Sequence, residues 1–175
     1  ATLAGGANCN VEVIYTPLTA AIHNDSIQVD FNNGVGNVNT LRPVTGTGLD
    51  PALLTIDGGP TYDYSTVITG GNATNTFTIN NTGDVSATGV TPAGLAGPFS
   101  YTGGSCGAII AAGATCTLIV DFDPIVGGPF GDTIDLNYND GIAAQTSSRD
   151  IEGVGVAAAR GAAPGAFGFA GRIAR

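Results

Sequence analysis

The chain contains an internal repeat that constrains its fold more than any other feature. Residues 3–34 align without a gap on residues 110–141, at an offset of 107 positions, and the same offset carries 44–49 onto 151–156. A repeat of this kind encodes one supersecondary unit twice, so the structure of one copy sets expectations for the other. Matched positions include Gly6/Gly113, Ala7/Ala114, Cys9/Cys116, Val13/Val120, Pro17/Pro124, Asp25/Asp132, Ile27/Ile134, Asn32/Asn139 and Gly34/Gly141.

Apolar and polar residues alternate within both copies, which is the period of a strand with one buried and one wet face. Each Asn-rich segment before Gly34 or Gly141 supplies residues that accept positive φ, as a hairpin turn requires. Gly, Thr and Asn interleaved with Val, Ile, Phe and Tyr favour strands and turns, and no run has helical period. The inward-facing sets are Val11, Val13 and Tyr15; Ile27, Val29 and Phe31; Leu118, Val120 and Phe122; and Ile134, Leu136 and Tyr138.

About seven short strands follow one another between residues 53 and 156, which is the size and rhythm of an immunoglobulin-like β-sandwich. The sequence therefore predicts an all-β chain of tandem immunoglobulin-like β-sandwiches. Residues 1–49 would be the second half of one repeat, an incomplete sandwich, and 50–157 a complete one. Residues 158–175 form a Gly/Ala-rich tail that ends in a candidate donor strand.

Four segments carry a resemblance to a known family: TFTINNTGD (76–84), the stretch 97–124 with its two cysteines, GDTIDLNYNDG (131–141) and IEGVGV (151–156). Together they resemble the bacterial choice-of-anchor D repeats, which are immunoglobulin-like modules related to the ASPM–SPD-2–Hydin group. The resemblance covers 53–156 fully and 1–49 as a second half only. It implies secreted or surface-displayed, non-enzymatic tandem modules, and it implies no catalytic residues.

The charge of the chain is uneven. The net charge is −9, but all 14 acidic residues precede the tail, which carries Arg160, Arg172 and Arg175. An acidic body argues against nucleic acid as a partner, because phosphates require a basic face. No apolar run is long enough to span a membrane. Since neither an initiator Met nor a signal peptide is present, we expect a processed or excised piece of a longer protein.

Two of the three cysteines flank a short turn that contains Gly. Cys106 and Cys116 could meet there as a disulfide; the alternative is a pair of buried free thiols. Cys9 has no evident partner. One histidine, His23, and no C-x-x-C pair predict that the chain holds no metal cofactor.

No set of residues is poised for catalysis, so we predict that the chain is not an enzyme and needs no cofactor. Four aspartates could gather around calcium, but their alternation favours charges that solubilise an outer sheet face. Rows of Thr and Asn leave a surface glycan as a second hypothetical partner. The four aspartates are Asp121, Asp123, Asp132 and Asp135.

The first copy lacks everything that matches 53–91, and it keeps three expected strands that cannot cover their own apolar faces. Either the missing strands precede Ala1 in a longer array, or another molecule completes the sandwich. In the second case the tail is a donor strand with Phe167, Phe169 and Ile173 as inserting side chains, beside Arg172 and Arg175. One strand cannot replace four, so more than one neighbour would be needed. The receiving face would consist of Val11, Val13, Tyr15, Ile27, Val29 and Phe31.

We therefore predict a structural subunit of an extracellular bacterial fibre or surface assembly. Copies of the chain would polymerise head to tail by β-strand complementation. The alternative is an adhesin or a carbohydrate-binding immunoglobulin-like module from a larger tandem-repeat surface protein. Both hypotheses place the chain outside the cell or on its surface.

Overall fold

The computed structural model describes residues 2–158, and every regular element in that range is a β-strand. The predicted tail residues Phe167, Phe169, Arg172, Ile173 and Arg175 lie outside the described residues. The strands are β1 (Ile22–Asn32), β2 (Asn37–Thr47), β3 (Leu54–Ile56), β4 (Thr61–Ile68), β5 (Ala73–Asn81), β6 (Ala87–Ala93), β7 (Phe99–Gly104), β8 (Ile109–Ile110), β9 (Thr115–Phe122), β10 (Gly128–Asn139) and β11 (Ala144–Val156).

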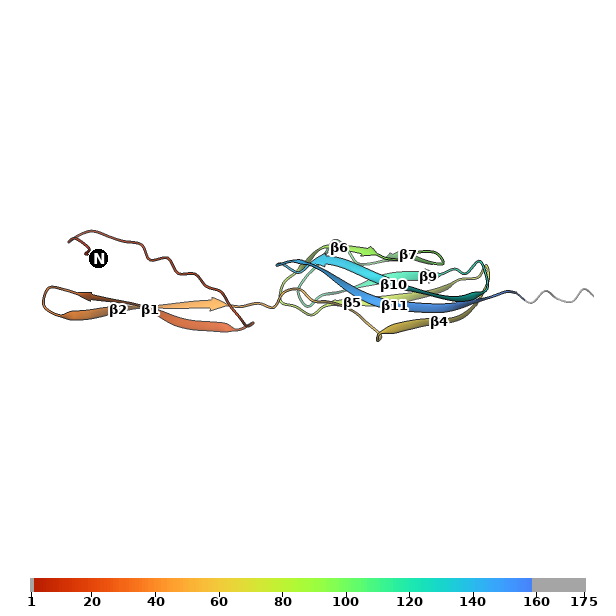
Figure 1. Cartoon of the computed structure of the whole chain (residues 1–175), viewed down its shortest axis with the longest axis horizontal. Coiled ribbons are helices and arrows are strands. Elements are labelled where there is room, and N and C mark those ends of the chain that lie inside the picture. The colour runs from red at the N-terminus through yellow and green to blue at the C-terminus, as the bar shows by residue number, and fades with distance from the viewer. Residues whose placement is uncertain (1, 159–175) are drawn as a thin grey trace, which may run out of the picture.

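Strands β3 to β11 form a two-layer sandwich, and β1 and β2 form a separate hairpin beyond one end of it (Figure 1). One layer has the order β4-β11-β10-β6-β8 and the other the order β3-β5-β9-β7. All neighbours are antiparallel except β4 and β11, which pair in parallel. The prediction of an all-β, immunoglobulin-like fold is confirmed.

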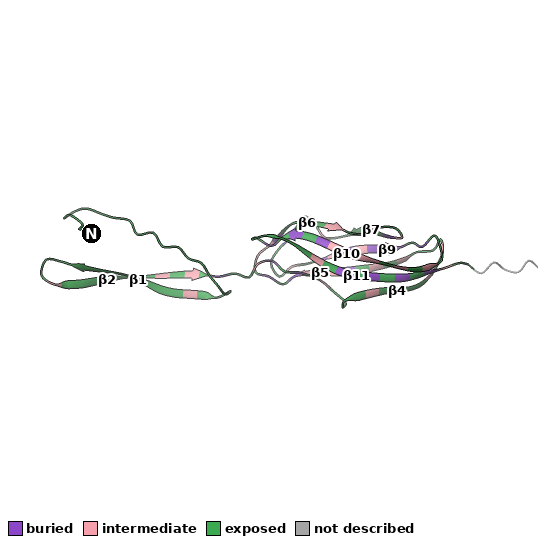
Figure 2. Cartoon of the chain, in the orientation of Figure 1, coloured by how far each residue is buried: buried purple, intermediate pink, exposed green. Residues whose placement is uncertain are grey.

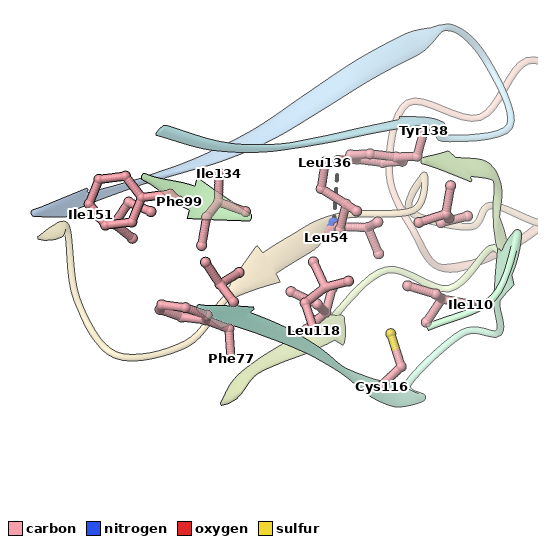
Figure 3. Packing of buried hydrophobic residues seen from close by; sticks show 14 of the residues in the cluster. Leu54, Phe77, Phe99, Ile110, Cys116, Leu118, Ile134, Leu136, Tyr138 and Ile151 are labelled. Carbon is pink, nitrogen blue, oxygen red and sulfur yellow. Dashed lines mark hydrogen bonds between the residues drawn. The ribbon is translucent and has the colours of Figure 1, made fainter. Parts of the chain in front are cut away.

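The core of the sandwich lies between the two layers. Figure 3 shows Ile134 and Leu136 of β10 pointing toward Phe77 of β5 and Leu118 of β9. Ile134 and Leu136 are fully buried. Their neighbours in sequence, Asp135 and Asn137, are not, so the strand alternates as the sequence predicts. A purple core therefore marks the sandwich in Figure 2, whereas no residue of β1 or β2 is buried.

One predicted strand is absent. Residues 11–15, which include Val11, Val13 and Tyr15, pair with no strand, and the prediction of a third strand in the first copy is wrong. The reason lies in the partners of the equivalent strand. In the second copy that strand is β9, which pairs with β5 and β7 and not with β10 or β11. The described chain offers the first copy no counterpart of β5 or β7, so the backbone of 11–15 has no ladder to join.

Candidate functional site

The β1–β2 hairpin repeats the β10–β11 hairpin in every pairing. Ile22 faces Thr47 as Pro129 faces Val154, and the offset of 107 holds along all of β1 as far as its last residue. The turns match as well. In the first hairpin the Gly34 amide donates to the Asn32 side-chain oxygen (2.8 Å), and the Gly141 amide does the same to Asn139 (2.9 Å). Because these interactions are local, the hairpin forms the same geometry with or without a covering layer.

The apolar face of the first hairpin is uncovered. In the sandwich, the face made by Ile134, Leu136 and Ile151 is at most 1% exposed. Of the equivalent first-copy residues, Val29 is 41% exposed, and Ile27 and Val44 are partly buried. Phe31, one turn of the pleat further on, is 47% exposed. We call this surface, formed by Ile27, Val29, Phe31, Val38 and Val44, the open face.

The segment before the hairpin contacts only one end of the open face. A methyl group placed on Gly46 would lie 2.7 Å from the Tyr15 ring, and one on Gly153 would lie 2.7 Å from the equivalent Phe122 ring. The Tyr15 hydroxyl also forms a hydrogen bond with His23 Nδ1 (2.6 Å). Tyr15 therefore keeps the position of Phe122 without its burial, since it is 46% exposed.

The other two predicted receiving residues of this segment do not cover the hairpin. Val11 and Val13 are 62% and 54% exposed. The structure thus brings Ile27, Val29 and Phe31 onto one strand face with Tyr15 at its end, and it leaves Val11 and Val13 outside any sheet.

The edges of the hairpin are unpaired within the described residues. In the sandwich, β11 lies between β10 and β4, and β10 lies between β11 and β6. In the first copy β1 and β2 pair only with each other. Two strand edges with free N–H and C=O groups beside an apolar face form a template for added strands.

An arginine at the centre of the open face escaped the sequence analysis. Arg149 pairs with Ile134 in the sandwich and is 4% exposed, and Arg42 pairs with Ile27 at the same position of the hairpin. The Arg149 guanidinium lies 5.1 Å from the centre of the Phe77 ring, and its Nη2 donates to a backbone oxygen (2.7 Å). The repeat offset could have revealed this pair, because Arg42 and Arg149 are the only basic residues before the tail.

A disulfide joins Cys106 and Cys116, as the sequence predicts, and Cys9 is a free, exposed thiol. The bond links the start of the loop before β8 to β9 and so fixes an edge of the complete sandwich. Between residues 2 and 158 no three His, Cys, Asp or Glu side chains gather as metal ligands would. The same part of the chain contains no helix long and apolar enough to cross a membrane.

Two facing sheets of short strands, closed by a parallel β4–β11 pair, define the class as an immunoglobulin-like β-sandwich. Within that class, the family model described as "HYDIN/CFA65/VesB-like, Ig-like domain" matches residues 56–153, and the chain belongs to this family. The match agrees with the predicted relation to the ASPM–SPD-2–Hydin group. The narrower resemblance to choice-of-anchor D repeats stays a prediction.

Solved structures share the fold at low sequence identity. The Vibrio cholerae VesB protease matches with a TM-score of 0.51 and 17% identity over 58% of this chain, which spans 31% of that protein. A Porphyromonas gingivalis W83 protein of unknown function matches with a TM-score of 0.50 and 11% identity, covering 81% of this chain and 69% of its own. The human CEP192 PapD-like domain 7 gives 0.49 and 14%, covering 60% and 86%. No curated protein matches the chain in sequence.

Proposed function

We propose that this chain is a structural subunit of an extracellular bacterial assembly, in which the β1–β2 hairpin accepts strands from other copies. One observation carries the proposal: the same hairpin occurs twice, covered in the second copy and uncovered in the first. The tail, residues 158–175, is the proposed donor.

The energetics favour such a contact. Burying a large apolar side chain contributes about 1.5–3 kcal/mol, and the open face holds several that are partly or largely exposed. Added strands also satisfy the free backbone groups of the two edges. One tail can pair with one edge only, so the second edge and the far end of the open face require a further neighbour.

Polarity and charge support a head-to-tail arrangement. Figure 1 shows the hairpin and the C-terminal end of β11 at opposite ends of the sandwich. A contact between opposite ends does not close on itself and builds a filament. The tail carries three arginines and the rest of the chain carries every acidic residue, so the two surfaces attract each other. The disulfide is consistent with an extracellular location, where such bonds persist.

The proposal is tested by comparing the full chain with a chain truncated after Ala163. We expect the full chain to form filaments or concentration-dependent oligomers, seen by sedimentation velocity and negative-stain electron microscopy. The truncated chain should sediment as a monomer with an unchanged circular dichroism spectrum.

A second variant addresses the acceptor. Val29→Asp keeps the tail but places a charge in the open face, and it should also abolish assembly. Asn24→Asp, on the opposite, wet face of β1, is the matched control and should assemble. A full chain that stays monomeric at high concentration overturns the proposal. If that monomer binds a glycan array, the adhesin alternative is supported instead.

A further inference from the structure

We infer that residues 166–173 of a second copy pair in parallel with the free edge of β2, with Phe167 beside Val44 and Ile173 beside Leu49. This inference rests on the proposed function and specifies its donor, its acceptor edge and its register. It is argued from the repeat, from the pairing of β4 with β11, and from the sequence of the tail.

The template is the neighbour of β11 in the complete sandwich. There β4 runs parallel to β11, with Tyr62 beside Ile151, Asp63 beside Glu152 and Ile68 beside Val156. Shifted by 107 positions, the β11 residues become Val44, Thr45 and Leu49 of the first copy. A strand equivalent to β4 therefore has a defined place along β2, and that place is vacant within residues 2–158.

The tail has the sequence pattern of β4. Residues 166–173 (AFGFAGRI) align without a gap on 61–68 (TYDYSTVI). Both segments place two aromatic residues two positions apart and end in Ile. In β4 the pairing is interrupted after Asp63, and Ser65 has a φ of 60°. The tail has Ala170 and Gly171 at the site of this irregularity, and glycine tolerates such backbone conformations.

The chemistry of the acceptor edge fits aromatic side chains at these two positions. The Arg149 guanidinium lies 6.0 Å from the centre of the Tyr62 ring, an arrangement that favours a cation over an aromatic face. By the same register Arg42 faces Phe167. The Tyr64 and Phe122 ring centres are 5.7 Å apart, and Tyr15 occupies the place of Phe122.

The second aromatic residue of the tail, Phe169, would therefore contact Tyr15. Ile68, the counterpart of Ile173, is 58% exposed. The register thus assigns the anchoring role to the two phenylalanines and an outward position to Ile173.

The donor must come from another copy. β11 spans 13 residues, about 40 Å, away from the loop in which the Asp140 oxygen accepts a hydrogen bond from the Ala52 amide. From Val156 to Phe167 the chain can extend at most about 40 Å. It would need that whole length to return to Ala52, and Val44 lies still further along the hairpin (Figure 1). Its own tail therefore falls short.

Direction leads to the same conclusion. A strand parallel to β2 runs from the tip side of the hairpin toward its own sandwich. A tail that leaves the far end of a preceding copy enters the hairpin of the next copy with this polarity, so each parallel strand continues the filament in one direction.

Cysteine cross-linking of the full chain tests the register. In a Cys9→Ser background, Thr45→Cys and Gly168→Cys stand at the counterparts of Glu152 and Asp63, which face each other on the exposed side. Neighbouring strands place such Cα atoms within the reach of a disulfide. Mild oxidation should give a ladder of covalent oligomers on a non-reducing gel, and mass spectrometry should identify the Thr45–Gly168 linkage.

Two matched controls accompany this variant. Thr47→Cys with Gly168→Cys shifts the pair by two residues, about 6.6 Å along the strand, and should cross-link at least about tenfold less. Glu152→Cys with Gly168→Cys uses the same site on β11, an edge that β4 already occupies, and should remain monomeric.

The possible failures are distinct. Assembly that persists while the Thr47 pair cross-links as well as the Thr45 pair overturns the register and leaves the proposed function standing. Linkage within a single chain overturns the assignment to a second copy. The absence of both assembly and cross-linking overturns the proposed function as well.

Discussion

The open face can be tested by one pair of identical substitutions at equivalent positions. Ile134 and Ile27 occupy the same place in the two hairpins, and each pairs with an arginine across the strands. Ile134 is 0% exposed between the two layers, whereas Ile27 is only partly buried. The difference between Ile134→Ala and Ile27→Ala therefore measures the covering layer itself.

The magnitude follows from burial. Ile134→Ala removes three buried carbons, about 2.4 kcal/mol at about 0.8 kcal/mol each, and the cavity that remains raises the loss to about 3–4 kcal/mol. For a domain of this size, the melting temperature should fall by at least about 12 °C. Ile27→Ala opens no closed cavity and should leave the unfolding transition of the sandwich within about 0.5 kcal/mol.

Urea unfolding followed by far-ultraviolet circular dichroism, at a concentration where the chain is monomeric, gives both free energies. Equal losses for the two variants would refute the reasoning, because they would show that the first hairpin is covered and unfolds with the sandwich. At assembling concentrations Ile27→Ala should weaken association, while Ile134→Ala should affect it only through unfolding.

Three further predictions concern the complete sandwich. Replacing Cys106 and Cys116 together by Ser should lower the free energy of unfolding by about 2–3 kcal/mol, the loop-entropy value for a closed loop of this length, measured by urea titration; no change would contradict it. Gly155→Ala should cost about 1–3 kcal/mol, because its methyl group would lie 2.4 Å from a backbone oxygen, whereas Gly131→Ala, with 3.7 Å available, should be nearly neutral in the same assay. Burial, followed by nearby carboxylates, raises the pKa of Tyr101 from 10.0 to about 12, so the neutral form is favoured in the folded state. Stability should therefore decline as the pH rises from about 10 through about 12, and Tyr101→Phe should flatten that decline in alkaline urea titrations; an unchanged slope would be evidence against it.

The sequence by itself determined the local structure. Alternation located the strand residues Ile134 and Leu136, and Asn-Gly turn chemistry fixed both hairpins, because these features depend on neighbours within a few residues. The spacing around a short turn also predicted the bond between Cys106 and Cys116. Since the repeat reproduces every local determinant, the two hairpins share one register.

Only the tertiary structure decided which strands exist and what covers them. Val11 and Val13 carry the strand pattern, yet they form no strand, because a strand requires a partner that the described chain does not provide there. The parallel pairing of β4 with β11 joins residues about 90 positions apart, and the burial of Arg149 depends on rings from β4 and β5. Such contacts arise from packing between distant segments, and no local pattern encodes them.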